Sequence, residues 1–189
     1  MPDNKLIKNR LWMIALIIIV SSISAGLLTL VNAGTKQRIA FNVEIKLKRS
    51  VLDVFAIPYE KSEIINIFNN RIEIGKINNR TVYRYYERGK LSGLAFKMKG
   101  AGFWGPISAL MALEPELEKI KGIIVLHQEE TPGLGGRITE AEFINQFPGR
   151  PVFPEVSVDA ITGATMTSNA FKRIINENVQ SFREEFQKK

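Results

Sequence analysis

The sequence predicts an α+β protein, in which one N-terminal transmembrane helix precedes a domain with a central, mostly antiparallel sheet flanked by helices. Three observations support this prediction: an uncharged apolar run at residues 11–31, alternating segments in the middle of the chain, and apolar residues at helical spacing towards both ends. The 189 residues suffice for one modest domain and one additional segment.

The apolar run at residues 11–31 is as long as the ~20 residues that are needed to cross a bilayer. Lys5, Lys8 and Arg10 precede it, which favours a cytoplasmic tail at residues 1–10 and places the remaining chain outside, although basic residues also follow the run. A cleaved signal peptide is the alternative, because residues 31–33 loosely resemble a cleavage site. A retained anchor is favoured, since the apolar core exceeds the roughly 7–15 residues of a signal.

The rest of the chain divides into a helical linker at residues 32–58 and an extracytoplasmic domain at residues 59–189. Apolar spacing predicts helices at residues 35–55, 59–68, 140–146 and 166–186. Period-2 patterns bounded by turn residues predict strands at residues 71–77, 80–88, 91–99, 107–114 and 122–127.

Composition excludes several kinds of chemistry. The chain has no cysteine, which excludes disulfides, thiolate metal sites and attached c-type haem, and one histidine cannot form a multi-histidine site. No metal site and no catalytic side chain are predicted, so redox chemistry would require an organic cofactor such as a flavin. The net charge of +7 suits an anionic lipid surface or an acidic partner, whereas the scattered basic residues do not predict nucleic-acid binding.

The segment at residues 159–168 carries the strongest local signal. Gly163 and Ala164 leave room for a bulky group to approach the main chain, and Thr165 lies just before or at the start of the last predicted helix. The free N–H groups of a helix N-terminus suit a phosphate. The alternative is a simple turn with a threonine N-cap.

Two further loops could contact a cofactor. In the first, Gly133 and Gly135 flank Leu134, so the backbone can lie against a flat ligand; a plain surface turn is the alternative. The second, at residues 100–106, formally fits the dinucleotide pattern, but Phe103 and Trp104 are too bulky there and Pro106 follows. Trp104 either stacks on a cofactor or fills the core.

The segment Asp-Ala-Ile-Thr-Gly-Ala-Thr resembles the flavinylation motif of the FMN-binding domain family. That family includes the G subunit of the Rnf electron-transport complex and the C subunit of the sodium-pumping NADH:quinone reductase. The resemblance implies FMN bound covalently by a phosphoester to Thr165. It also implies that a flavin transferase reads four neighbouring residues: Asp159, Thr162, Gly163 and Ala164. The hydroxyls of Thr167 and Ser168 would lie near the phosphate.

The two loops are similar to further family motifs. Residues 127–135 resemble His-x-Glu-Thr-Pro-Gly-Leu-Gly with one additional residue, which aligns Glu130 with the family glutamate and moves His127 out of register. Residues 100–105 resemble Gly-x-Gly-x-Trp-Gly. The resemblance implies cofactor contact by five residues: Glu130, Thr131, Leu134, Gly135 and Trp104.

Together these motifs imply an electron-transfer subunit of a membrane-bound, ion-translocating oxidoreductase complex of the Rnf type. The alternatives are a C-type subunit of the sodium-pumping quinone reductase and a stand-alone anchored flavin module that serves an extracytoplasmic reductase. The implied partners are other membrane subunits, the flavin transferase and the lipid bilayer. The chain is not expected to catalyse a reaction alone.

Overall fold

The structure is a computed structural model that describes residues 4–187. The chain forms two compact units, Met1–Glu44 and Ile45–Lys189. Residues 1–3 of the predicted tail and residues 188–189 of the predicted domain lie outside the described residues.

Helix α1 (Asn4–Val54) contains the predicted span. Its apolar window has a mean hydropathy of 2.6 and none of it is buried within the protein. A helix that is apolar on all sides cannot hide its surface in water, so this segment is suited to a bilayer. The helix supports the association of the chain with a membrane.

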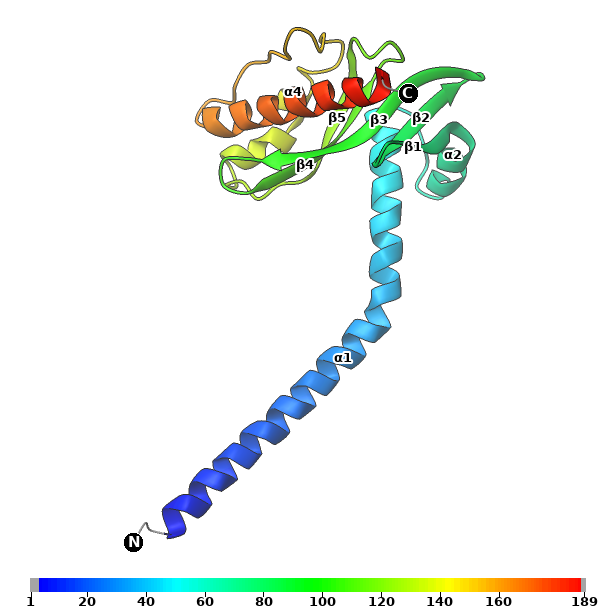
Figure 1. The fold of residues 1–189 in the computed structure, drawn as a ribbon. Helices are drawn as coiled ribbons and strands as arrows, with labels where there is room; N and C mark the ends of the chain where they lie inside the picture. Colours follow the sequence, from blue (N-terminus) through cyan, green and yellow to red (C-terminus); the bar gives the residue numbers. More distant parts are fainter. Residues whose placement is uncertain (1–3, 188–189) are drawn as a thin grey trace. The chain divides into compact units, whose positions relative to one another are not determined.

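The second unit contains a five-stranded antiparallel sheet in the order β1-β2-β3-β4-β5 (Figure 1). Its strands are β1 (Ile72–Ile77), β2 (Arg80–Glu87), β3 (Lys90–Ala101), β4 (Pro106–Leu113) and β5 (Ile120–His127). All five lie where alternation and turn residues predict them, and the predicted α+β class is confirmed.

Alternation along the strands produces one apolar core on each face of the sheet. Phe96, Met98 and Met111 belong to the core beneath α4 (Thr165–Gln187), together with the short helices η1 (Gly135–Thr139) and α3 (Ala141–Ile144). Ala95 and Leu110, which are next to them in sequence, belong to the opposite core. That second core is completed by the last turns of α1 and by α2 (Ile64–Arg71).

The last turns of α1 therefore pack within the domain, although the sequence predicts a linker there. Leu52 has no exposed surface and Val54 is 3% exposed. Helix α2 begins later than the predicted residue 59, because the chain first reverses direction after α1. In that reversal the Tyr59 hydroxyl donates to Asp53 at 2.7 Å, and Ala56 has a positive φ of 54°.

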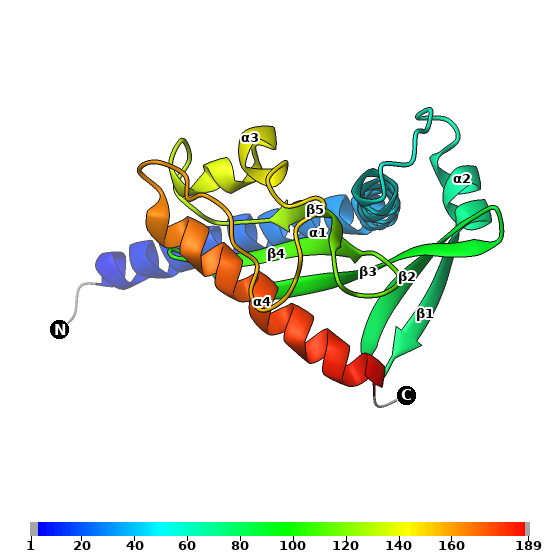
Figure 2. The same cartoon turned by 90° about the horizontal axis from the view of Figure 1, so that it is seen from above.

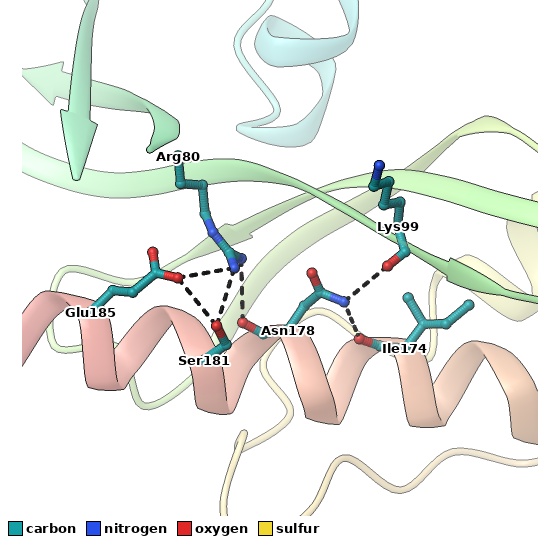
Figure 3. Close-up of polar contacts among 6 residues, drawn as sticks. All are labelled: Arg80, Lys99, Ile174, Asn178, Ser181 and Glu185. Carbon is teal, nitrogen blue, oxygen red and sulfur yellow. Dashed lines mark hydrogen bonds and ion pairs between the residues drawn. The ribbon is translucent and has the colours of Figure 1, made fainter. Parts of the chain in front are cut away.

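Helix α4 crosses one face of the sheet and is held there by Arg80 (Figures 2 and 3). The Arg80 guanidinium lies 3.3 Å from Glu185 and 5.3 Å from the centre of the Phe96 ring. Asn178 donates to the Lys99 carbonyl oxygen at 3.3 Å. These contacts fix the position of α4 on the sheet and therefore the position of its first residue, Thr165.

Candidate cofactor site

The turn that leads into α4 presents Thr165 to solvent. Thr165 is the first residue of this 23-residue helix and is exposed. The turn before it depends on Gly163, whose φ of 81° lies in the region that favours glycine. Because the first N–H groups of a helix have no intrahelical acceptor, Thr165 lies beside donors that suit a phosphate.

Internal hydrogen bonds hold this turn. The Ser168 hydroxyl accepts from the Ile161 N–H at 3.0 Å and donates to the Ala164 carbonyl at 3.0 Å. The side-chain oxygen of Gln146 accepts from the Asp159 N–H at 2.8 Å. Ser168 therefore closes the turn. Gln146, which was not predicted as a site residue, supports Asp159 at its start.

The four hydroxyl groups of the segment fall into two classes. Those of Thr162 and Thr165 belong to exposed residues, whereas Thr167 is 3% exposed and Ser168 has no exposed surface. Both buried hydroxyls are already engaged within the protein. Thr165 is thus the hydroxyl at the head of the helix that an incoming group can reach.

A tight turn joins β3 to β4 and carries two exposed aromatic residues. The Gly102 N–H donates to the Gly105 carbonyl at 2.9 Å and closes the turn. Trp104 is 71% exposed and its ring centre lies 5.5 Å from that of Phe103. The alternative that Trp104 fills the core is therefore wrong. A strand follows this turn, so it lacks the helix that a dinucleotide site requires.

Glu130 connects this aromatic turn to the start of α4. Its Oε1 accepts from the N–H groups of Phe103 at 2.8 Å and Trp104 at 3.0 Å. Its Oε2 accepts from the Thr167 hydroxyl at 2.6 Å. We call these four residues the Glu130 cluster. With 4% of its surface exposed, Glu130 is one of the few buried charged residues in the described part of the chain.

The Glu130 cluster keeps the carboxyl group ionised. Burial by itself would raise the pKa of Glu130, but the bonds donated by Thr167 and by the backbone of residues 103–105 outweigh it and lower the pKa below 4.5. Gly102 and Gly135 supply the space that this carboxylate occupies. A Cβ on Gly102 would collide with Oε1, and one on Gly135 would lie 2.9 Å from Oε2.

The loop before η1 places Leu134 next to the turn that leads into α4. Leu134 is 50% exposed, and its Cδ2 lies 3.7 Å from the position of a Cβ on Gly163. The Thr131 carbonyl accepts from the N–H groups of Leu134 and Gly136, which folds the loop over. His127 is exposed at the end of β5, where it lies 3.1 Å from Glu129 and belongs to no cluster that suggests chemistry.

The three predicted motifs therefore meet at one end of the domain. Exposed apolar side chains at this end come from separate segments: Phe103, Trp104, Leu134 and Met166. Phe103 and Met166 were not predicted as site residues, although a large apolar residue beside a turn can indicate one. An open, apolar surface beside a reachable hydroxyl and a helix N-terminus fits a flat ring system that carries a phosphate.

Comparison with known proteins agrees with this geometry. Residues 102–180 match the model of the FMN-binding domain. This region of the chain is similar to an FMN-binding domain. The resemblance noted in the sequence is confirmed, and the matched region includes the aromatic turn, Glu130 and Thr165.

Relatives of this chain include named subunits of two complexes. It is 30% identical over 100 residues to the C subunit of the Na(+)-translocating NADH-quinone reductase of Pasteurella multocida. This match covers 44% of this chain and 38% of that protein. The chain thus spans less than half of that relative. It is 26% identical over 180 residues to the G subunit of the ion-translocating oxidoreductase complex of Methanosarcina acetivorans, which covers 90% of this chain and 91% of that protein.

Solved structures share the fold of this chain. NqrC of Shewanella oneidensis matches with a TM-score of 0.67 at 22% identity, over 75% of this chain and 95% of that one. The C subunit of the Na(+)-translocating NADH-quinone reductase of Parabacteroides distasonis matches with a TM-score of 0.65 at 21% identity, over 76% of this chain and 92% of that one. At these identities the likeness concerns the fold.

Proposed function

We propose that this chain is the FMN-carrying electron-transfer subunit of a membrane-bound, ion-translocating oxidoreductase complex of the Rnf type, with FMN joined to Thr165 by a phosphoester. The observation that carries the proposal is the exposed Thr165 at the head of α4, within a matched FMN-binding domain. FMN would supply the electron-transfer chemistry, and the protein would hold the cofactor and tune its potential.

Attachment at Thr165 would be a substitution at phosphorus, with the threonine oxygen as the nucleophile. Its Oγ would bond to the phosphorus of an activated flavin nucleotide and lose its proton, while the other half of that nucleotide departs with the electrons of the broken P–O bond. A flavin transferase would catalyse this step. The charge that remains on the phosphodiester would be stabilised by the N-terminus of α4.

The surrounding residues would recognise the transferase and the ring. Asp159 and Thr162 are exposed, and with Gly163 and the buried Ala164 they form the turn that a flavin transferase would read. Trp104 and Leu134 would provide apolar contact for the ring: both are exposed, Leu134 lies beside Gly163, and the backbone of Trp104 is joined to α4 through Glu130.

The remaining predicted contacts would act mainly through the backbone around them. Thr131 and Gly135 would shape the loop that carries Leu134. Ser168 and Thr167 lie in the first turn below the proposed phosphate, but their hydroxyls are engaged within the protein.

The Rnf type is favoured over the quinone reductase by coverage. The relationship to the Methanosarcina protein extends over 91% of that protein, against 38% for the Pasteurella protein. A place in a complex with other membrane subunits follows from the named complexes of these relatives. Such partners would receive and deliver the electrons.

The proposed location is the cell membrane, with a cytoplasmic N-terminus and the FMN-binding domain on the extracytoplasmic side. Lys8 and Arg10 directly precede the apolar run, and short basic segments at the start of a chain tend to remain in the cytoplasm. A covalent bond would be useful on the outer side because a lost flavin could not be replaced from the cytoplasmic pool.

The test is mass analysis of the chain produced with a flavin transferase. The wild type should gain the mass of FMN less one water, on the peptide that contains Thr165, and fluoresce in a denaturing gel. Thr165→Ala should lose both signals. Thr167→Val is the matched control and should keep them, because its hydroxyl is buried and bonded to Glu130. Flavin retained in Thr165→Ala would refute the assignment.

A further inference from the structure

We infer that Glu130 is a positioning residue that joins the aromatic turn to the first turn of α4, rather than a residue that contacts the cofactor. The inference deepens the proposed function and rests on it, since the group to be positioned is the flavin at Thr165. Its physical basis is the Glu130 cluster, whose hydrogen bonds join protein groups to one another without a cofactor.

Both oxygens of the carboxylate are already engaged by protein groups. One oxygen accepts from the backbone of Phe103 and Trp104, and the other accepts from the Thr167 hydroxyl. With 4% of Glu130 exposed, little of the residue can meet a molecule at the surface. The predicted direct contact of Glu130 with the cofactor is therefore replaced by an indirect role.

The cluster joins two segments that would otherwise be independent. The aromatic turn is the connection between β3 and β4, whereas Thr167 lies two residues after Thr165 on α4. A flavin held by a single phosphoester can rotate about several bonds, so an apolar wall at a fixed position would restrict its ring. Glu130 sets the position of that wall, formed by Phe103 and Trp104, relative to the point of attachment.

The chemistry of the side chain makes substitution informative. An ionised carboxylate only accepts hydrogen bonds, and the Thr167 hydroxyl and the two backbone N–H groups all donate to it. In Glu130→Gln the side chain keeps its shape but loses its charge: the amide oxygen can still accept from the backbone N–H groups, while the NH2 group can only donate to the Thr167 oxygen. Thr167→Val removes the hydroxyl from the other side without a change of shape.

The first measurement is amide hydrogen exchange at Phe103 and Trp104 in the full chain carrying Thr165→Ala, so that no flavin is attached there. Glu130→Gln should speed exchange at both amides about tenfold, because their hydrogen bonds to a charged acceptor become weaker bonds to a neutral one. Glu129→Gln is the matched control: Glu129 is exposed and pairs with His127, and exchange should stay at the wild-type rate.

The second measurement uses the flavinylated chain with an intact Thr165. The midpoint potential of the flavin should shift in Glu130→Gln and in Thr167→Val, and Thr167→Ser, which restores a hydroxyl, should return it towards the wild-type value. A role in stability alone would lower the melting temperature without this pattern of loss and rescue.

Two results would overturn the inference. The first is wild-type exchange at Phe103 and Trp104 in Glu130→Gln. The second is a shifted potential in that variant with unchanged exchange in the flavin-free chain, which would indicate direct contact. If the wild type carried no covalent flavin, the proposed function would fail separately, whereas the exchange measurement would still decide whether Glu130 holds the turn. Should Glu130→Gln not fold, the comparison of Thr167→Val with Thr167→Ser decides.

Discussion

Gly135→Ala should disrupt the Glu130 cluster, because the new methyl group has no room. A Cβ at this position would lie 2.5 Å from the Thr167 Oγ1, 2.9 Å from the Glu130 Oε2 and 3.0 Å from the Glu130 Cβ. Neither neighbour can move into solvent, since Glu130 and Thr167 are 4% and 3% exposed and are bonded to each other at 2.6 Å. The methyl group must therefore break this hydrogen bond or displace the first turn of α4.

The expected cost of Gly135→Ala follows from these two routes. Overpacking a buried site costs about 1–3 kcal/mol, and losing a bond to a charged group costs about 1.5–3 kcal/mol. Because the two routes are alternatives, the free energy of unfolding should fall by about 2–3 kcal/mol. For a domain of this size the melting temperature should fall by roughly 4–12 °C.

The assay is thermal unfolding of the purified full chain in detergent, followed by near-ultraviolet circular dichroism. Gly136→Ala is the matched control, because the nearest atom to its Cβ is the Nε2 at the end of the Gln128 side chain, at 3.3 Å. It should change the melting temperature little. Equal melting temperatures for Gly135→Ala and the wild type, or equal losses for the two variants, would refute the packing argument.

Two further predictions concern acid and membrane topology. The pKa of Glu130 is lower in the folded chain than its ordinary value of 4.5, so its contribution to stability is complete above that pH and is lost as the pH falls through the lower folded value. In Glu130→Gln the melting temperature should therefore fall less steeply as the pH is lowered, whereas Glu129→Gln should behave like the wild type. Identical curves of melting temperature against pH for the wild type and Glu130→Gln would contradict this. The chain has no cysteine, so Asn9→Cys and Asn79→Cys can report topology. In cells whose envelope outside the cell membrane is permeabilised, a membrane-impermeant maleimide should label Asn79→Cys but not Asn9→Cys. Labelling of Asn9→Cys alone would invert the proposed orientation.

Local patterns were sufficient for the elements of this fold. The span follows from the length of an uncharged apolar run, and the strands follow from period-2 alternation between turn residues. The start of α2 was predicted too early, because the reversal after α1 depends on contacts such as Tyr59 with Asp53. Propensity alone does not contain such contacts.

The sequence by itself determined the long apolar helix, the α+β class and the motif that contains Thr165, because each depends on residues that are neighbours along the chain. Only the tertiary structure decided which hydroxyls are reachable, that Trp104 is exposed, and that Glu130 is enclosed by protein groups. Glu130 meets Phe103 and Thr167 across 27 and 37 residues of sequence. Burial and hydrogen bonding over such separations arise when the sheet and α4 pack together, and no local pattern encodes them.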